Sequence, residues 1–241
     1  MLAAPFVAAA SLELYVALDI TGSFAEDQEA AQAQVTKILS GLTEGSCVEV
    51  VAITESEPLI LLARDCVPRC DRLADEEKIR AARNKVLKRW QESKLRTELN
   101  TSGRNESDVF AVLWHISQRL PATPERQQIV ILLSDLRNTA RGINLEKPAR
   151  IDVGRVLADV RKEKAIFPFR GVRVIAEGVH NRPFKKQPKS FAYAESLRQF
   201  WTSYFQDTGA TGIEFYSGFG KATETLGSMP RPPGAVCRNQ N

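Results

Sequence analysis

The stretch LYVALDITGSF, residues 14–24, decides the fold. It begins as a run of apolar residues, and that run ends at Asp19. Two hydroxyl side chains, Thr21 and Ser23, follow at alternate positions. The apolar run predicts a short strand that is buried on both faces. A carboxylate and two hydroxyls directly after such a strand indicate a site at its carboxyl end.

Buried strands and amphipathic helices alternate along the rest of the chain. Short apolar runs predict strands at 13–19, 47–54, 59–63, 128–135, 172–178 and 213–216. Helical spacing of apolar residues, or a run of good helix formers, predicts helices at 25–40, 72–99, 109–120, 152–164 and 190–207. The short link at 55–58 favours a hairpin, which makes 59–63 an antiparallel edge strand. We therefore expect a doubly wound, Rossmann-like α/β fold with a mostly parallel sheet and helices on both faces.

One domain accounts for most of the chain. At 241 residues, with 43% hydrophobic and 26% charged residues, the chain can bury a sizeable core, and it shows no internal repeat. We assign 1–11 to an apolar N-terminal segment, 12–226 to the domain and 227–241 to a disordered Pro/Arg-rich tail. No stretch has the roughly 20 consecutive apolar residues of a membrane span.

The N-terminal segment and the cysteines bear on location. Ala8 and Ala10 have the spacing of the small residues that precede a signal-peptide cleavage site. The positively charged n-region of a signal peptide is missing from this stretch. We predict export to the periplasm or the cell surface, with a cytoplasmic location as the alternative. Four cysteines permit two disulfides, and Cys66 and Cys70 can close a small oxidised loop, which would fit export.

The polar residues after the first strand have two candidate companions. Ser107 begins the helix after a polar loop, and Asp135 ends the strand at 128–135. In a parallel sheet ligands gather at the carboxyl ends of the strands, near the switch in strand order. Carboxylates and hydroxyls are hard oxygen ligands that suit Mg²⁺, with Mn²⁺ or Ca²⁺ as alternatives. Neutral hydroxyls leave the ion enough positive charge to bind an anionic group of a partner.

Three segments resemble the von Willebrand factor A domains. Asp19–Ser23 matches that family's Asp-x-Ser/Thr-x-Ser motif after the first strand. Ser107–Val109 resembles the family's Thr-Asp-Ile helix start, with serine in place of threonine. Ile129–Asp135 resembles its strand that ends in Thr-Asp-Gly, but Ser134 and Leu136 replace the threonine and the glycine.

The resemblance extends from about residue 13 to 217 and implies a function. It implies a metal-ion-dependent adhesion site formed by five residues: Asp19, Thr21, Ser23, Ser107 and Asp135. Such a domain is a protein-binding module without catalysis, whose ion is completed by an Asp or Glu of a partner protein. Arg137 and Arg141 are candidates for steering that acidic partner to the site.

Each candidate also has a purely structural explanation. Ser23 with Glu26 forms a capping-box pattern, and Ser107 can be a helix N-cap. Asp135 can accept backbone hydrogen bonds in a turn. His115 lies within an amphipathic helix, where we expect a half-buried and hydrogen-bonded side chain.

Two other functions stay open as alternatives. A phosphohydrolase of the haloacid dehalogenase type also has an aspartate after its first strand, but here Thr21 replaces the second aspartate, which would act as general acid/base. A nucleic-acid binder can use the stretch 141–189, which has thirteen basic and five acidic residues. The net charge of only +4 and the lack of an aromatic–basic motif argue against it. We expect neither an enzyme nor a nucleic-acid partner.

Overall fold

The computed structural model describes residues 11–54, 60–69, 76–98, 106–121, 126–146, 149–179 and 190–229. The strands are β1 (Leu12–Asp19), β2 (Cys47–Ile53), β3 (Leu61–Cys66), β4 (Gln127–Leu133), β5 (Arg173–Glu177) and β6 (Gly212–Tyr216). The helices are α1 (Gln28–Ser40), α2 (Glu76–Glu98), α3 (Val109–Arg119), α4 (Val153–Lys162), α5 (Phe191–Asp207) and α6 (Lys221–Ser228). A short 3-10 helix, Gly22–Phe24, joins β1 to α1.

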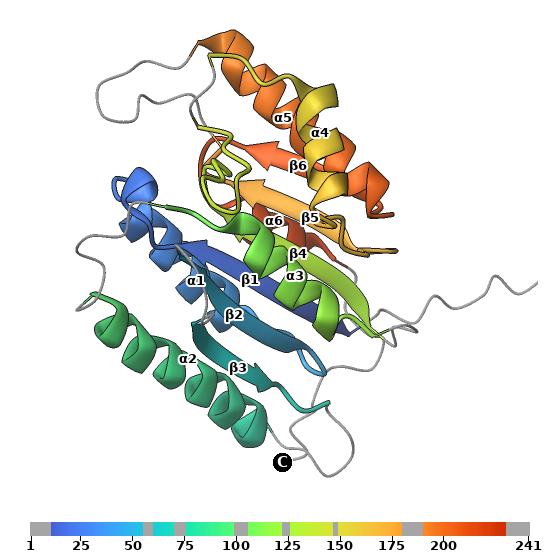
Figure 1. Ribbon diagram of the computed structural model, residues 1–241. Helices are drawn as coiled ribbons and strands as arrows, with labels where there is room; N and C mark the ends of the chain where they lie inside the picture. The colour runs from blue at the N-terminus through green and yellow to red at the C-terminus, as the bar shows by residue number, and fades with distance from the viewer. Residues whose placement is uncertain are drawn as a thin grey trace, which may run out of the picture.

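The sheet has six strands in the order β3-β2-β1-β4-β5-β6 (Figure 1). Five strands run parallel, and β3 pairs with β2 in the antiparallel sense at one edge. The predicted doubly wound fold with one antiparallel edge strand is confirmed. The chain leaves β1 towards β2 and later returns on the other side as β4, so the order of strands switches between β1 and β4.

Alternation of side chains along the strands builds a core on each face of the sheet. In β1, Val16 packs with the core under α1, α2 and α6, while Tyr15 and Ala17 join the core under α3, α4 and α5. Figure 1 shows the two groups of helices on opposite faces of the sheet. Both cores are mainly apolar, and Glu49 on β2 is an exception that is buried within the sheet.

The helix α6 is missing from the sequence prediction. It has only eight residues and a glycine, so its own sequence favours a helix weakly. Its first turn is held by a buried carboxylate of β5, because the backbone N–H of Ala222 donates to Glu177 Oε1 at 2.6 Å. A tertiary hydrogen bond thus stabilises this helix, which ends at Ser228.

The disulfide differs from the pairing considered in the sequence. Cys47 and Cys66 face each other in the β2–β3 register and form a disulfide, with their Cα atoms 4.0 Å apart. The Cys66–Cys70 loop that the sequence permits does not form, because antiparallel pairing brings Cys47 opposite Cys66. Cys70 itself lies outside the described residues.

Several predictions fall on other parts of the chain that the structure does not describe. They concern residues 1–10, 180–189 and 230–241. Among the described residues, no helix has the length and apolar character needed to cross a bilayer. The proposed domain boundaries stay predictions.

Candidate metal centre

The candidate residues gather where the strand order switches. Asp19 is the last residue of β1, and Asp135 follows β4 by two residues. Both side chains are buried, as are those of Thr21 and Ser107. The carboxyl ends of β1 and β4 meet at this edge because the two strands are parallel neighbours.

Three hydroxyl groups from two distant segments meet at Thr21. Thr21 Oγ1 lies 2.7 Å from Ser107 Oγ and 3.2 Å from Ser23 Oγ. It also donates a hydrogen bond of 2.6 Å to Asp19 Oδ1. The structure therefore brings four of the five predicted ligands into one continuous hydrogen-bonded group.

The spacing of these oxygens suits a small divalent ion. In an octahedral shell at about 2.1 Å from Mg²⁺, neighbouring oxygens lie about 3.0 Å apart. The two hydroxyl separations, 2.7 and 3.2 Å, bracket that length. The residues present therefore fit a hard cation in both donor type and spacing.

Asp19 is fully buried beside a second carboxylate. Its Oδ1 accepts hydrogen bonds from the N–H and hydroxyl of Thr21, and its Oδ2 accepts one of 2.7 Å from Ser134 Oγ. Burial, and then the charge of nearby Asp135, raise the pKa of Asp19 to about 7, although these hydrogen bonds oppose the shift. The charged form is thus costly here, and a bound cation would offset that cost.

Asp135 makes the turn contact expected of it. Its Oδ1 accepts a hydrogen bond of 3.0 Å from the backbone N–H of Arg137. The Nε atom of Arg137 lies 3.6 Å from Asp135 Oδ2, and its guanidinium carbon lies 5.7 Å from the centre of the Tyr193 ring. Arg137 is only 1% exposed, so it lies inside the centre rather than on the surface where a partner contact was expected.

The two serines do not have the capping roles considered for them. The N-cap of α1 is Asp27, four residues after Ser23. The N-cap of α3 is Asp108, whose carboxylate accepts a hydrogen bond from the N–H of Ala111. Both capping explanations are therefore wrong, and the hydroxyls of Ser23 and Ser107 point to the Thr21 group instead.

A loop after β4 holds the start of α3 in place, and the sequence reasoning missed its role. Thr139 Oγ1 accepts a hydrogen bond from the N–H of Ser107, and the N–H of Thr139 donates to the carbonyl of Ser107. Asn138 Oδ1 accepts one from the N–H of Val109. Asn138 and Thr139 follow Asp135 closely in the sequence, and their side chains can both donate and accept hydrogen bonds. This pattern was the signal from which the role of the loop could have been predicted.

Arg141 and His115 have partners outside the Thr21 group. Arg141 Nε donates to Asp108 Oδ2 at 2.6 Å, and its side chain stays 46% exposed. His115 Nε2 lies 2.7 Å from Glu49 Oε1, which confirms the half-buried, hydrogen-bonded histidine.

The donor set is unusual in having few charged ligands. Within the described residues, no group of three or more His, Cys, Asp or Glu side chains could hold a metal ion. The candidate centre has two carboxylates, and the other predicted ligands are hydroxyls. An ion here would keep much of its charge for an outside ligand.

Solved structures share this fold at low sequence identity. The PilB minor pilin from Streptococcus sanguinis matches with a TM-score of 0.52 and 13% identity, over 93% of this chain and 61% of that chain. A single-residue variant of that pilin matches with a TM-score of 0.57 and 12% identity over the same shares. A von Willebrand factor type A protein from Catenulispora acidiphila matches with a TM-score of 0.44 and 17% identity, over 90% of this chain and 40% of that chain.

These likenesses show the fold alone. This chain spans less than two thirds of the pilin and of the von Willebrand factor type A protein. No family model and no curated protein matches the chain.

Proposed function

We propose that this chain is a von Willebrand factor A-type domain that binds a protein partner through a divalent ion. Asp19, Thr21, Ser23, Ser107 and Asp135 would hold Mg²⁺, or Mn²⁺ or Ca²⁺ in its place. The ion would supply a positive charge that accepts an Asp or Glu side chain of the partner. The domain is a binding module and not an enzyme.

One observation supports this proposal above the others. The hydroxyls of Thr21, Ser23 and Ser107 converge, and neither serine is used as the helix cap that would otherwise explain it. Buried and half-buried hydroxyls grouped beside two carboxylates have no role in packing the apolar core. Their chemistry and spacing fit an ion that keeps one side open.

The proposal includes export. The Cys47–Cys66 disulfide supports it, because disulfides persist mainly in oxidising compartments. The apolar N-terminal segment predicted from the sequence agrees with that location.

Calorimetric titration of Mg²⁺ into EDTA-treated and dialysed protein tests the ion. We expect one site in the wild type and loss of binding in Asp19→Ala. Because Asp19 is buried, Ser23→Ala serves as a milder variant, and exposed Asp159→Ala on α4 is the matched control. Equal binding by the wild type and both site variants, or no binding at millimolar Mg²⁺, would contradict the proposal.

The partner's carboxylate is tested with a blocked peptide that contains one aspartate. Water-proton relaxation of the Mn²⁺-loaded protein should fall when this peptide displaces water from the ion. The same peptide with asparagine should have no effect. An equal effect of both peptides would exclude the carboxylate bridge while leaving the ion in place.

A further inference from the structure

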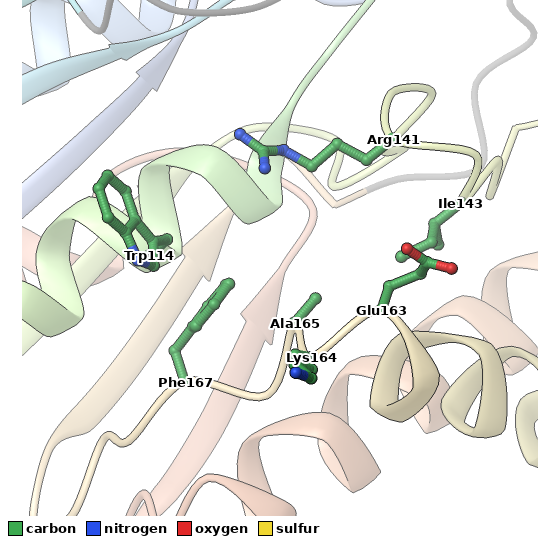
Figure 2. Close-up of a pocket in the computed structure, with 7 residues that line it drawn as sticks. All are labelled: Trp114, Arg141, Ile143, Glu163, Lys164, Ala165 and Phe167. Carbon is green, nitrogen blue, oxygen red and sulfur yellow. The ribbon is translucent and has the colours of Figure 1, made fainter.

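A pocket of about 480 Å³ lies between α3 and the segment that follows α4 (Figure 2). Four of its lining residues are apolar: Trp114, Ile143, Ala165 and Phe167. Its volume falls within the range of about 300–1,000 Å³ that is typical of binding sites for small groups. Figure 2 shows Phe167 between Trp114 and Ala165, with the loop that carries Arg141 across the pocket from them.

Trp114 leaves a large aromatic surface in contact with solvent. Its side chain is on α3, and the residue is 45% exposed, although most large apolar residues of the described chain are buried. Exposed tryptophans in pockets are frequent anchors of protein interfaces, because one rigid ring buries a large area. An aromatic side chain from a partner would suit the Trp114 and Phe167 rings.

The charge around the pocket has a small positive excess, because Arg141 is paired with Asp108 while Lys162 and Lys164 outnumber Glu163. Arg141 and Lys164 line it against one acidic residue, Glu163. The last turn of α4 adds exposed Lys162 and also Arg161, whose charge is paired with Asp207. This field favours a partner segment that is acidic near its aromatic residue.

Two lining residues adopt a backbone conformation that usually requires glycine. Arg141 and Lys164 have φ angles of 56° and 55°. Lys164 ends α4 in a Schellman arrangement, since its N–H donates to the carbonyl of Arg161 and the N–H of Ala165 donates to that of Val160. Glycine would adopt this φ angle without strain, whereas lysine adopts it at a cost in backbone conformational energy.

The pocket borders the candidate metal centre. Arg141, which lines the pocket, donates to Asp108 Oδ2 at 2.6 Å. Asp108 directly follows Ser107, whose hydroxyl lies 2.7 Å from Thr21 Oγ1. The pocket is therefore connected to the candidate metal centre through the Arg141–Asp108 contact at the start of α3.

We infer that this pocket is a second anchor for the protein partner and takes an aromatic side chain from an acidic segment. The identity of the partner rests on the proposed function, but the pocket contains none of the proposed metal ligands. Binding in the pocket should therefore persist without a divalent ion, which separates the two proposals experimentally.

The test uses the ¹⁵N-labelled full chain in EDTA and blocked peptides with one phenylalanine. We expect the peptide with flanking aspartates to shift the NMR signals of the Trp114 indole N–H and the Ala165 amide. Replacing its phenylalanine by alanine should weaken binding at least about fivefold, and replacing the aspartates by lysines about two- to fivefold. Equal binding of all three peptides, or shifts confined to other regions, would overturn the inference.

Protein variants complete the test. Trp114→Ala should abolish the peptide shifts, while Leu61→Ala, at a comparably exposed residue on β3, should preserve them. Lys164→Gly should raise the melting temperature by relieving the left-handed backbone, and yet weaken the acidic peptide about two- to fivefold. Unchanged peptide affinity in Trp114→Ala or in Lys164→Gly would overturn the inference. The wild-type chain should bind the peptide equally in EDTA and in millimolar Mg²⁺, and a loss of binding in EDTA would overturn the pocket's independence of the ion.

Discussion

The hydroxyl oxygens of Thr21 and Ser107 lie 2.7 Å apart, although 86 positions separate the two residues in the chain. We expect Ser107→Ala to weaken Mg²⁺ binding about tenfold or more, because it removes one oxygen ligand from the shell. Ser117→Ala is the matched control, since Ser117 lies on α3 and its hydroxyl donates to the carbonyl of Trp114. Calorimetry on both variants measures the difference, and equal affinities would show that Ser107 is not a ligand.

Arg137 should lower the affinity of the centre for cations. Its guanidinium lies beside Asp135 in a buried site, where like charges repel a divalent ion strongly. We expect Arg137→Met to bind Mn²⁺ about tenfold more tightly than the wild type. In EDTA the same variant should melt at a lower temperature, because it leaves Asp135 buried without this ion pair. Titrations monitored by electron paramagnetic resonance measure the affinity, and an unchanged or weaker affinity would refute the prediction.

The stability of the EDTA-treated protein should fall between about pH 4 and pH 7. Burial and the neighbouring Asp135 raise the pKa of Asp19 from 3.8 to about 7, so the folded protein holds this proton more tightly than the unfolded chain. This stabilisation is complete below about pH 4 and is lost as the pH rises through about 7. One such group gives a slope of up to about 1.4 kcal/mol per pH unit.

Urea denaturation across this pH range measures the slope. Asp19→Asn should flatten it, because the amide does not titrate, and saturating Mg²⁺ should raise stability most at the upper end of the range. An identical slope in Asp19→Asn would assign the effect to another group.

The Cys47–Cys66 disulfide should stabilise the β2–β3 edge of the sheet. The two residues are 19 positions apart, and a loop of that size contributes about 3 kcal/mol by restricting the unfolded chain. We expect Cys47→Ala with Cys66→Ala to lower the free energy of unfolding by about that amount. Peptide mapping without reductant identifies the pairing, and a peptide that links Cys66 to Cys70 would contradict the structure.

The sequence predicts those features whose cause is local. The apolar run before Asp19 and the spacing of Thr21 and Ser23 were sufficient to place a buried strand and a polar site at its end. The helix α6 was missed because Glu177, far away in the chain, holds its first turn. The burial of Arg137 was missed because residue order does not reveal the direction in which a side chain points after a turn.

The backbone of Leu136 gives a sharp test of the turn that carries Asp135. Leu136 has a φ angle of 60°, and its side chain is fully buried. The von Willebrand factor A domains, which the sequence resembles, have glycine at this place in their motif. Its N–H donates to Ser134 Oγ at 2.9 Å, and its carbonyl accepts a hydrogen bond of 3.0 Å from Trp201 Nε1. These bonds hold a left-handed conformation that costs a non-glycine residue about 1–2 kcal/mol.

Leu136→Ala and Leu136→Gly both lose the packing of the leucine side chain, which costs about 2–5 kcal/mol. At ordinary positions the glycine variant is the less stable of such a pair, by about 0.4–1 kcal/mol. Here we expect the reverse, with Leu136→Gly about 1 kcal/mol more stable than Leu136→Ala, because only glycine adopts this φ angle without strain. Urea denaturation compares the two variants: where the free energy of unfolding depends equally on the urea concentration, the variant with the higher midpoint is the more stable. If the alanine variant is as stable as the glycine variant, the turn relaxes in the alanine variant, and Mg²⁺ binding should then weaken in that variant because the turn that carries Asp135 has changed.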